Sequence, residues 1–192
     1  MDQKNVTTTG LGRRRFIGWG AVAAAAALSP LGAQAATPAR KAAVRSLSFF
    51  NTHTGERLKA TYCCDGKYEP QALKDINHIL RDWRVDQVKP IDPNLLDLLH
   101  ELSGTLEVDT PFHIISGYRS PDTNATLRSK GGAHTGVASQ SLHMVGRAID
   151  IRVPGVKLDQ LRGAARSLKL GGVGYYPSSN FVHVDTGRVR SW

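Results

Sequence analysis

The sequence of 192 residues is poor in cysteine: it has only two, at the adjacent positions Cys63 and Cys64. Neighbouring cysteines do not close an ordinary disulfide without strain, because bridged Cα atoms prefer a separation of about 5.5–6 Å. A zinc site made of thiolates would need more cysteines than the chain supplies. We therefore interpret the two residues as neighbours on one strand, with one side chain buried and the other on the opposite face.

The sequence also lacks a long hydrophobic run. Its Ala-rich apolar stretch, Trp19 to Leu28, is shorter than the roughly 18–20 residues that span a bilayer, so no permanent membrane anchor is expected. The stretch follows three arginines at 13–15 and precedes Ala33-Gln34-Ala35, which has the pattern of a cleavage site. Paired arginines before a short apolar run are typical of a twin-arginine signal, which predicts export to the periplasm.

These limits define the expected organisation of the chain. Residues 1–35 are predicted to be the signal peptide, and residues 36–45, rich in Ala, Arg and Lys, a flexible start of the mature protein. The remaining length is sufficient for one domain with a hydrophobic core, and neither a linker nor a repeat divides it. Residues 46–192 are therefore expected to form a single domain.

Apolar spacing divides this domain into helices and strands. Helical spacing covers residues 69–84, 92–104 and 158–170, and a short helix is expected at 121–127. Strands are predicted at 46–51, 56–62, 112–116, 147–153, 172–176 and 181–185. Residues 129–140 lack apolar periodicity and are predicted to be a mobile loop. Segregated helices and strands predict an α+β fold, with a mostly antiparallel central sheet flanked by helices.

The first candidate for chemistry is the segment from Ser139 to Asp150. It carries His143 and Asp150, and Gly146 between them permits a tight turn. Residues 148–153 alternate like a half-buried strand, so Asp150 is expected to come back toward His143.

The second candidate is Phe181-Val-His183-Val-Asp185. His183 and Asp185 are two residues apart and share one strand face, while the two valines occupy the other. A lone buried histidine is most often an ordinary core residue. Two imidazoles and a carboxylate together, however, suit a catalytic zinc ion that keeps a fourth position open. We predict one zinc ion per chain, held by His143, Asp150 and His183.

Other histidines compete with these ligands. His113 is the credible rival, because it shares a strand face with Ile115 and leads toward Arg119; it could instead orient a ligand or contact the substrate. His53, His78 and His100 have ordinary surface explanations, whereas His134 lies in the glycine-rich loop and is either a mobile substrate contact or simply exposed to solvent.

Three segments together resemble a known family. Ser116-Gly-Tyr118-Arg119-Ser, Ser141-x-His143-x-x-Gly-x-Ala-x-Asp150 and His183-x-Asp185 are similar to motifs of the zinc D-Ala-D-Ala peptidases and their hedgehog-like relatives. The resemblance to the murein endopeptidase K-like branch of that family covers nearly all of the chain after the leader. It includes the segments 53–56, 171–177, 181–187 and 189–192.

The resemblance implies a hedgehog/D-Ala-D-Ala peptidase-like fold over residues 46–192. It also implies a periplasmic zinc endopeptidase that hydrolyses peptide cross-links of peptidoglycan, with diaminopimelate–diaminopimelate links as the suggested substrate. Arg119 is expected to steady the oxyanion or a substrate carboxylate. Ser141, Tyr118 and His113 are expected substrate contacts. Two alternatives stay open: a D-Ala-D-Ala carboxypeptidase or dipeptidase, and a zinc-containing cell-wall binding protein without catalysis.

The general base is where the sequence departs from the wider family. Many relatives place Glu or Asp three residues before the last zinc histidine, but this chain has Asn180 there, which does not accept a proton at neutral pH. Asp185 is the nearest acidic substitute and is predicted to be catalytic. The alternative is that Asp185 orients an imidazole.

Basic residues outnumber acidic ones. The whole chain has a formal net charge of +9, and removal of residues 1–35 takes away four basic residues and one acid, which leaves +6. An exported protein is not expected to bind nucleic acid, so we expect peptidoglycan peptides as the partner. A basic surface would favour encounters with this anionic polymer. A solvated surface without a specific partner is the alternative.

Overall fold

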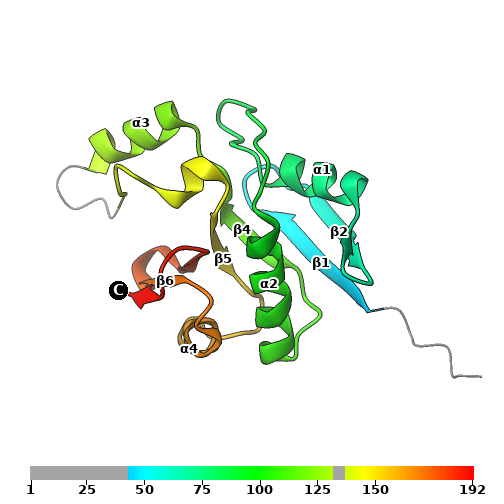
Figure 1. Cartoon of the computed structure of the whole chain (residues 1–192). Coiled ribbons are helices and arrows are strands. Elements are labelled where there is room, and N and C mark those ends of the chain that lie inside the picture. Colours follow the sequence, from blue (N-terminus) through cyan, green and yellow to red (C-terminus); the bar gives the residue numbers. More distant parts are fainter. Residues whose placement is uncertain (1–42, 132–136) are drawn as a thin grey trace, which may run out of the picture. The chain divides into compact units, whose positions relative to one another are not determined.

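The computed structural model describes residues 43–131 and 137–192 (Figure 1). The predicted signal peptide and residues 132–136 lie outside this part. The described helices and strands are β1 (Val44–Asn51), β2 (Arg57–Cys64), β3 (Lys67–Tyr68), α1 (Pro70–Ile79), α2 (Pro93–Leu106), β4 (Phe112–Ser116), α3 (Pro121–Gly131), the 3₁₀ helix η2 (Leu142–Val145), β5 (Ala148–Arg152), α4 (Leu158–Leu168), β6 (Gly172–Tyr176), the 3₁₀ helix η3 (Pro177–Ser179), β7 (Phe181–Asp185) and β8 (Arg190–Ser191).

The strands form one eight-stranded sheet in the order β3-β2-β1-β4-β5-β7-β6-β8. The α+β class is confirmed, but the prediction of a mostly antiparallel sheet is wrong, because the sheet is mixed. β1 pairs with β4 in parallel, and β6 pairs with β8 in parallel. Parallel neighbours need a crossover connection, and α1 and α2 lie between β1 and β4 along the chain. Local alternation of side chains does not reveal such pairings.

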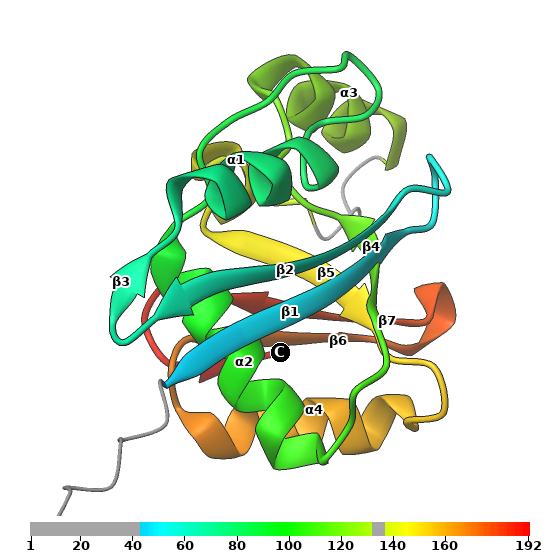
Figure 2. The same cartoon turned by 90° about the vertical axis from the view of Figure 1, so that its right-hand side faces the viewer.

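Helices α2 and α4 lie on the same face of the sheet (Figure 2). Asp92 accepts a hydrogen bond from the backbone N–H of Asn94 and caps α2, and Pro93 occupies its first turn, as the sequence predicts. The core between the helices and the sheet is apolar and fully or almost fully buried; it includes Leu95, Leu96, Leu99, Leu102, Ile149, Ile151, Leu161, Val182 and Val184. None of the described helices is long and apolar enough to cross a membrane.

Several predicted boundaries move: β1 begins at Val44, inside the segment 36–45 that was predicted to be flexible, and the largest changes are in α1 and α3. α1 ends at Ile79 and not near Arg84, because Asp82 is buried and its carboxylate accepts hydrogen bonds from the backbone N–H groups of Arg84 and Ser120. These contacts take the chain out of the helix and tie it to the loop after β4. α3 continues to Gly131, so residues 129–131 are helical where a loop was predicted.

The cysteine interpretation holds. Cys63 is buried and Cys64 is half-buried on β2, and both are free thiols. Consecutive strand residues point to opposite faces, which accounts for the difference in burial.

A sharp turn at Gly146 connects η2 to β5. Gly146 adopts a φ of 68°, in the left-handed region. A Cβ atom there would lie 2.3 Å from the backbone oxygen of Pro90, and Gly146 O accepts a hydrogen bond from the backbone N–H of Asp92. Glycine is therefore required at position 146 for two reasons: its left-handed backbone angle and the close approach of the segment before α2.

Substitution Gly146→Ala is expected to destabilise the fold. The left-handed conformation alone costs a non-glycine residue about 1–2 kcal/mol, and the contact with Pro90 adds to this cost. Gly155→Ala is the matched control, because Gly155 also has a positive φ, 82°, but has no neighbouring atom within 4 Å of an added Cβ. Urea unfolding should show a larger loss for Gly146→Ala than for Gly155→Ala; equal losses would mean that the contact with Pro90 relaxes without cost.

Candidate metal centre

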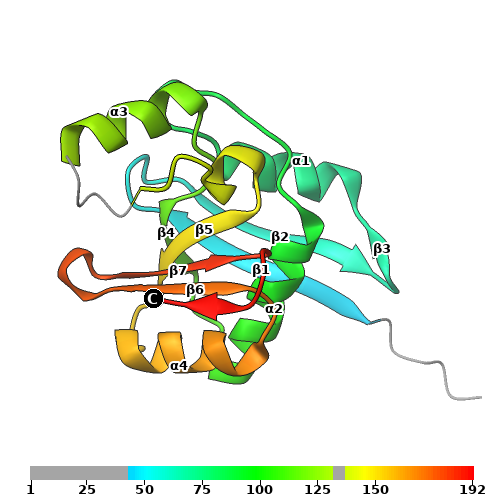
Figure 3. The same ribbon diagram turned by 60° about the vertical axis from the view of Figure 1, so that its left-hand side comes forward.

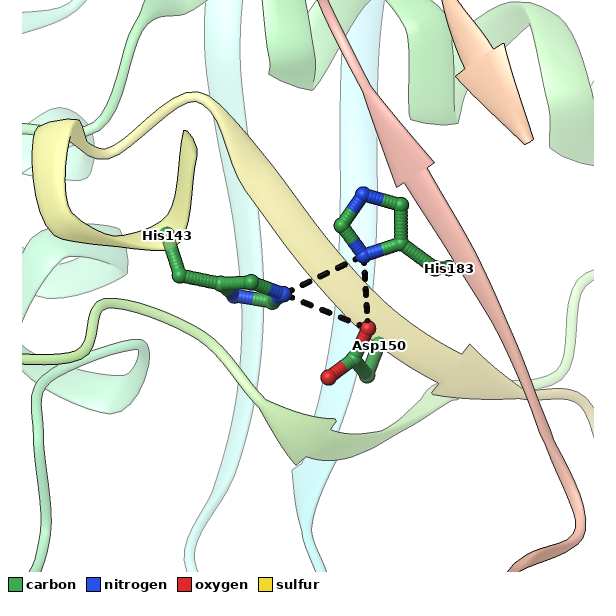
Figure 4. Close-up of side chains that lie close together, drawn as sticks. All are labelled: His143, Asp150 and His183. Atoms are coloured by element: carbon green, nitrogen blue, oxygen red, sulfur yellow. Dashed lines mark hydrogen bonds and ion pairs between the residues drawn. The ribbon is translucent and has the colours of Figure 1, made fainter. Parts of the chain in front are cut away.

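The three predicted metal ligands come from neighbouring elements (Figure 4). Asp150 on β5 and His183 on β7 are direct partners in the antiparallel pairing, so their side chains leave the same face of the sheet side by side. Val182 and Val184 fill the opposite, fully buried face. His143 reaches the same point from η2, after which the turn at Gly146 leads into β5.

One atom of each side chain converges on a single point. His183 Nδ1 lies 2.8 Å from Asp150 Oδ1 and 3.2 Å from His143 Nε2, and His143 Nε2 lies 3.3 Å from Asp150 Oδ1. A tetrahedral zinc ion with ligand bonds of about 2.0–2.1 Å separates its ligand atoms by about 3.3 Å. The triangle therefore has the size that zinc requires. Among the described residues this is the one group of three or more His, Cys, Asp and Glu side chains that could hold a metal ion.

Hydrogen bonds on the far side of each ring fix which nitrogen faces the centre. His143 Nδ1 lies 2.7 Å from the backbone oxygen of Gly117, and a carbonyl only accepts, so Nδ1 carries the proton. His183 Nε2 lies 3.0 Å from Asp185 Oδ2, so by the same reasoning Nε2 donates to this carboxylate. His143 Nε2 and His183 Nδ1 are consequently the nitrogens that face the centre, as in metal ligands whose other nitrogen is held by an acceptor.

The charges and burial of the three side chains favour a cation between them. Burial lowers the pKa of His143 below its usual value, and the charge of Asp150 opposes this shift. Burial by itself raises the pKa of Asp150, but His143 and His183 outweigh it and bring the pKa well below its usual range. Burial by itself lowers the pKa of His183, but Asp150 and Asp185 raise it to about 9. In the metal-free protein a proton thus holds the ligand atoms together, and a metal ion would replace it.

Asp185 is fully buried, and both of its oxygens are occupied. Oδ1 accepts from the backbone N–H groups of Gly172, at 3.1 Å, and Gly187, at 2.8 Å, while Oδ2 accepts from His183. The guanidinium of Arg190 donates to both oxygens, at 3.0 and 2.7 Å. Burial on its own raises the pKa of Asp185, but these hydrogen bonds lower it well below its usual range. Such a carboxylate is suited to orienting His183 and is a weak proton acceptor.

Arg119 is buried but loosely held. Its guanidinium donates over 3.3 Å to Asn124 Oδ1, 3.4 Å to Ser116 Oγ and 3.5 Å to Asp150 Oδ2, and its buried Nε has no hydrogen-bond partner. Burial lowers the pKa of Arg119, while Asp150 opposes this shift. A buried cation with long bonds and an unpaired donor retains capacity for another anionic or carbonyl oxygen.

These side chains open on a cavity of about 250 Å³. Of the predicted site residues, it is lined by His143, Asp150, His183, Arg119, Asp185 and Ser141. Aromatic rings of Tyr176, Phe181 and Trp192 form part of its wall, with Tyr176 and Phe181 stacked at 4.6 Å between ring centroids. In the part of the chain that the structure describes, the only carboxylates lining the cavity are Asp150 and Asp185.

Two predicted substrate contacts lie outside the cavity lining. Tyr118 is buried in the core, and its backbone N–H donates to Leu80 O. His113 pairs with Arg152 on β5, and its ring packs against Phe50 at 4.8 Å between centroids. The position that carries an acid in many relatives, Asn180, is the exposed left-handed residue that ends η3, so it serves the turn.

Sequence reasoning missed the role of Arg190. The terminal segment 189–192 contributed to the family resemblance, but an arginine in a two-residue strand gives no periodic signal. The tripeptide Asp185-Thr-Gly187 was the available clue, since a glycine just after a carboxylate permits a turn that brings the following residues back toward it.

Comparisons with known proteins identify the family of the chain. The profile of the family described as "Peptidoglycan L,D-endopeptidase MepK" matches residues 39–192. The protein of that name from Escherichia coli (strain K12) is 43% identical over 180 residues, covering 94% of this chain and 96% of the relative. The "Probable peptidoglycan L,D-endopeptidase MepK" of Haemophilus influenzae is 39% identical over 181 residues, covering 94% and 95%. The resemblance drawn from the motifs is thereby confirmed, and the chain belongs to the MepK family of peptidoglycan endopeptidases, hydrolytic enzymes of the metallopeptidase class.

Proposed function

We propose that the protein is a zinc-dependent endopeptidase that hydrolyses L,D peptide cross-links of peptidoglycan. The observation that carries this proposal is the convergence of His143 Nε2, Asp150 Oδ1 and His183 Nδ1 within 2.8–3.3 Å of one another. Nitrogen and oxygen ligands without thiolates, at the foot of an open cavity, are typical of catalytic zinc. The names of the relatives support the class of bond, and diaminopimelate–diaminopimelate links are the substrate that we favour.

The chemistry divides between the metal and the chain. Zinc, when bound by the three ligands, supplies a Lewis acid for the scissile carbonyl and lowers the pKa of a bound water toward about 7. Arg119 lines the cavity, and its weakly engaged Nη groups would donate to the carbonyl oxygen as negative charge develops on it, or to a substrate carboxylate. Ser141, at the start of η2, lies on the cavity wall where a substrate peptide would pass.

We propose that Asp185 orients His183 and is not the general base. All of its acceptor sites are engaged, and its pKa is lowered, so little driving force is left for taking up a proton. Among the described residues no third carboxylate lines the cavity. The site would then work without a separate carboxylate base from this part of the chain.

We also propose that residues 1–35 direct export by the twin-arginine pathway and that the protein works in the periplasm. The arginines at 13–15, the short apolar run and the Ala33-Gln34-Ala35 site support this proposal. Peptidoglycan lies outside the cytoplasm, so a hydrolase of this polymer has to be exported.

Purified protein is expected to bind about one zinc ion per chain. His143→Ala and His183→Ala each remove one of three ligands and should lose most of the bound zinc, measured by metal analysis after dialysis. His113→Ala is the matched control and should keep the parental zinc content, because His113 lies outside the cavity lining. Full zinc occupancy in either ligand variant, with loss in His113→Ala, would reverse the ligand assignment.

Asp185→Asn separates the two roles of this residue. If Asp185 orients His183, the variant should bind zinc about 10–100-fold more weakly, and turnover should largely return when zinc is supplied in excess. If Asp185 is the base, zinc affinity should stay unchanged while turnover falls about 10²–10⁴-fold. Zinc affinity from competition with a chelator and turnover at saturating zinc distinguish these outcomes.

Digestion of cross-linked muropeptides tests the activity itself. The zinc-loaded protein should cleave dimers joined by diaminopimelate–diaminopimelate links, and a chelator should stop the cleavage. Arg119→Lys keeps the charge but loses the planar fork, and kcat should fall about 10²–10³-fold. Arg128→Lys, an exposed position on α3, should leave kcat unchanged.

The same digestion decides between the proposed function and its alternatives. Release of D-alanine from uncross-linked peptides, with the dimers left intact, would favour the carboxypeptidase. Zinc-loaded protein that cleaves neither substrate would be the binding protein without catalysis.

A further inference from the structure

The last strand of the chain brings a second arginine to the metal centre. β8 runs parallel to β6, with Arg190 opposite Gly172, and lies beside it in Figure 3. Backbone hydrogen bonds from Trp192 N–H to Val173 O and from Tyr175 N–H to Trp192 O fix this pairing. Gly172 is also the partner of Asp185 on β7. The sheet register therefore places Arg190 beside Asp185.

Both Nη groups of Arg190 bond within the chain. Nη1 donates to Asp185 Oδ1 at 3.0 Å and to Arg188 O at 3.1 Å, and Nη2 donates to Asp185 Oδ2 at 2.7 Å. The ring of Trp192 packs against the guanidinium, 4.8 Å from its central carbon. Arg119 lines the same cavity but holds only bonds of 3.3–3.5 Å. The two arginines thus differ in kind: Arg119 has donors to spare, whereas Arg190 holds a carboxylate.

Strand β6 leaves room for this pair. A Cβ atom on Gly172 would lie 2.2 Å from Arg190 Nη1 and 2.5 Å from Asp185 Oδ2. A side chain at position 172 would displace either the guanidinium or the carboxylate. Because glycine has no side chain, the guanidinium of Arg190 can bond to both oxygens of Asp185, and this pair of bonds fixes the plane of the carboxylate.

We propose that Arg190 is a positioning residue that holds the plane of Asp185 and, through Asp185, the ring of His183. The sequence of contacts runs from the guanidinium to Asp185 Oδ2, from Oδ2 to His183 Nε2, and across the ring to the Nδ1 that faces the metal point. The backbone N–H groups of Gly172 and Gly187 hold only Oδ1, so without the guanidinium the oxygen that meets His183 has no other partner, whereas the fork engages both oxygens. This inference rests on the proposed metal site and adds the device that aims one of its ligands.

The test compares Arg190→Gln and Arg190→Lys with a matched control, Arg188→Gln. Arg188 is exposed, lies two residues away on the same tail, and its replacement removes the same charge. Each full-length variant is titrated with zinc against a competing chelator, and with Co²⁺, whose visible absorption reports the ligand geometry. The zinc-induced rise in the melting temperature and the far-UV circular dichroism are measured alongside.

Arg190→Gln should bind zinc about 10–100-fold more weakly than the parent, as expected for loss of a group that orients a metal ligand. Its Co²⁺ spectrum should change and its zinc-induced rise in melting temperature should shrink. Arg190→Lys should recover part of the affinity, because it keeps a cation on Asp185 without the fork. Arg188→Gln should match the parent in all three measurements.

The inference would be overturned if both Arg190 variants kept the parental zinc affinity and an unchanged Co²⁺ spectrum, even with a lower melting temperature. The ion pair of Arg190 with Asp185 would then be purely structural. If Arg190→Gln does not fold, Arg190→Lys decides, with a changed Co²⁺ spectrum expected and a parental one contradicting the inference. A parent protein that binds neither metal would instead overturn the proposed function.

Discussion

One ligand atom each from His143, Asp150 and His183 lies within 2.8–3.3 Å of the other two, and acceptor atoms this close need a positive charge between them, either the proton of the metal-free protein or a metal ion. The surrounding contacts hold the atoms there all the same. Gly117 O fixes one ring, Asp185 fixes the other, and the pairing of β5 with β7 fixes the carboxylate. The fold therefore keeps the three side chains in place before a metal arrives, and a metal ion that binds there replaces the proton.

Positive charge around this centre is divided between two tasks. Arg190 neutralises the buried Asp185 and keeps it aligned with His183, and both of its Nη groups bond to this carboxylate. Arg119 lines the cavity and its Nη groups make only long bonds, so it retains the capacity to donate to an oxygen of the substrate. A permanently charged, planar guanidinium suits both tasks. Only the loosely held Arg119, however, can donate to an oxygen on which negative charge develops during amide hydrolysis.

The sequence predicts the ligands better than it predicts their surroundings. The alternation around His183 and Asp150 and the glycine at 146 placed the three predicted metal ligands on adjoining elements, and the structure brings them together. The parallel pairing of β1 with β4 joins segments far apart in the sequence, and the contact of Arg190 with Asp185 comes from a strand too short to show a period. Local patterns therefore reveal neither of them.

The early end of α1 also depends on a contact between distant segments, because the carboxylate of Asp82 accepts a hydrogen bond from a backbone N–H in a loop 38 residues away. His113 was a candidate for a site contact because it shares a strand face with Ile115. The strand register places it opposite Arg152, and its ring packs against Phe50.

X-ray absorption at the zinc edge of the metal-loaded protein tests most directly the claim that these three side chains form one zinc site. The structure predicts a first shell of nitrogen and oxygen at about 2.0–2.1 Å with no sulfur, together with outer-shell scattering from two imidazole rings. Scattering from a single imidazole, or a zinc–sulfur distance of about 2.3 Å that would implicate Cys63 or Cys64, would contradict it.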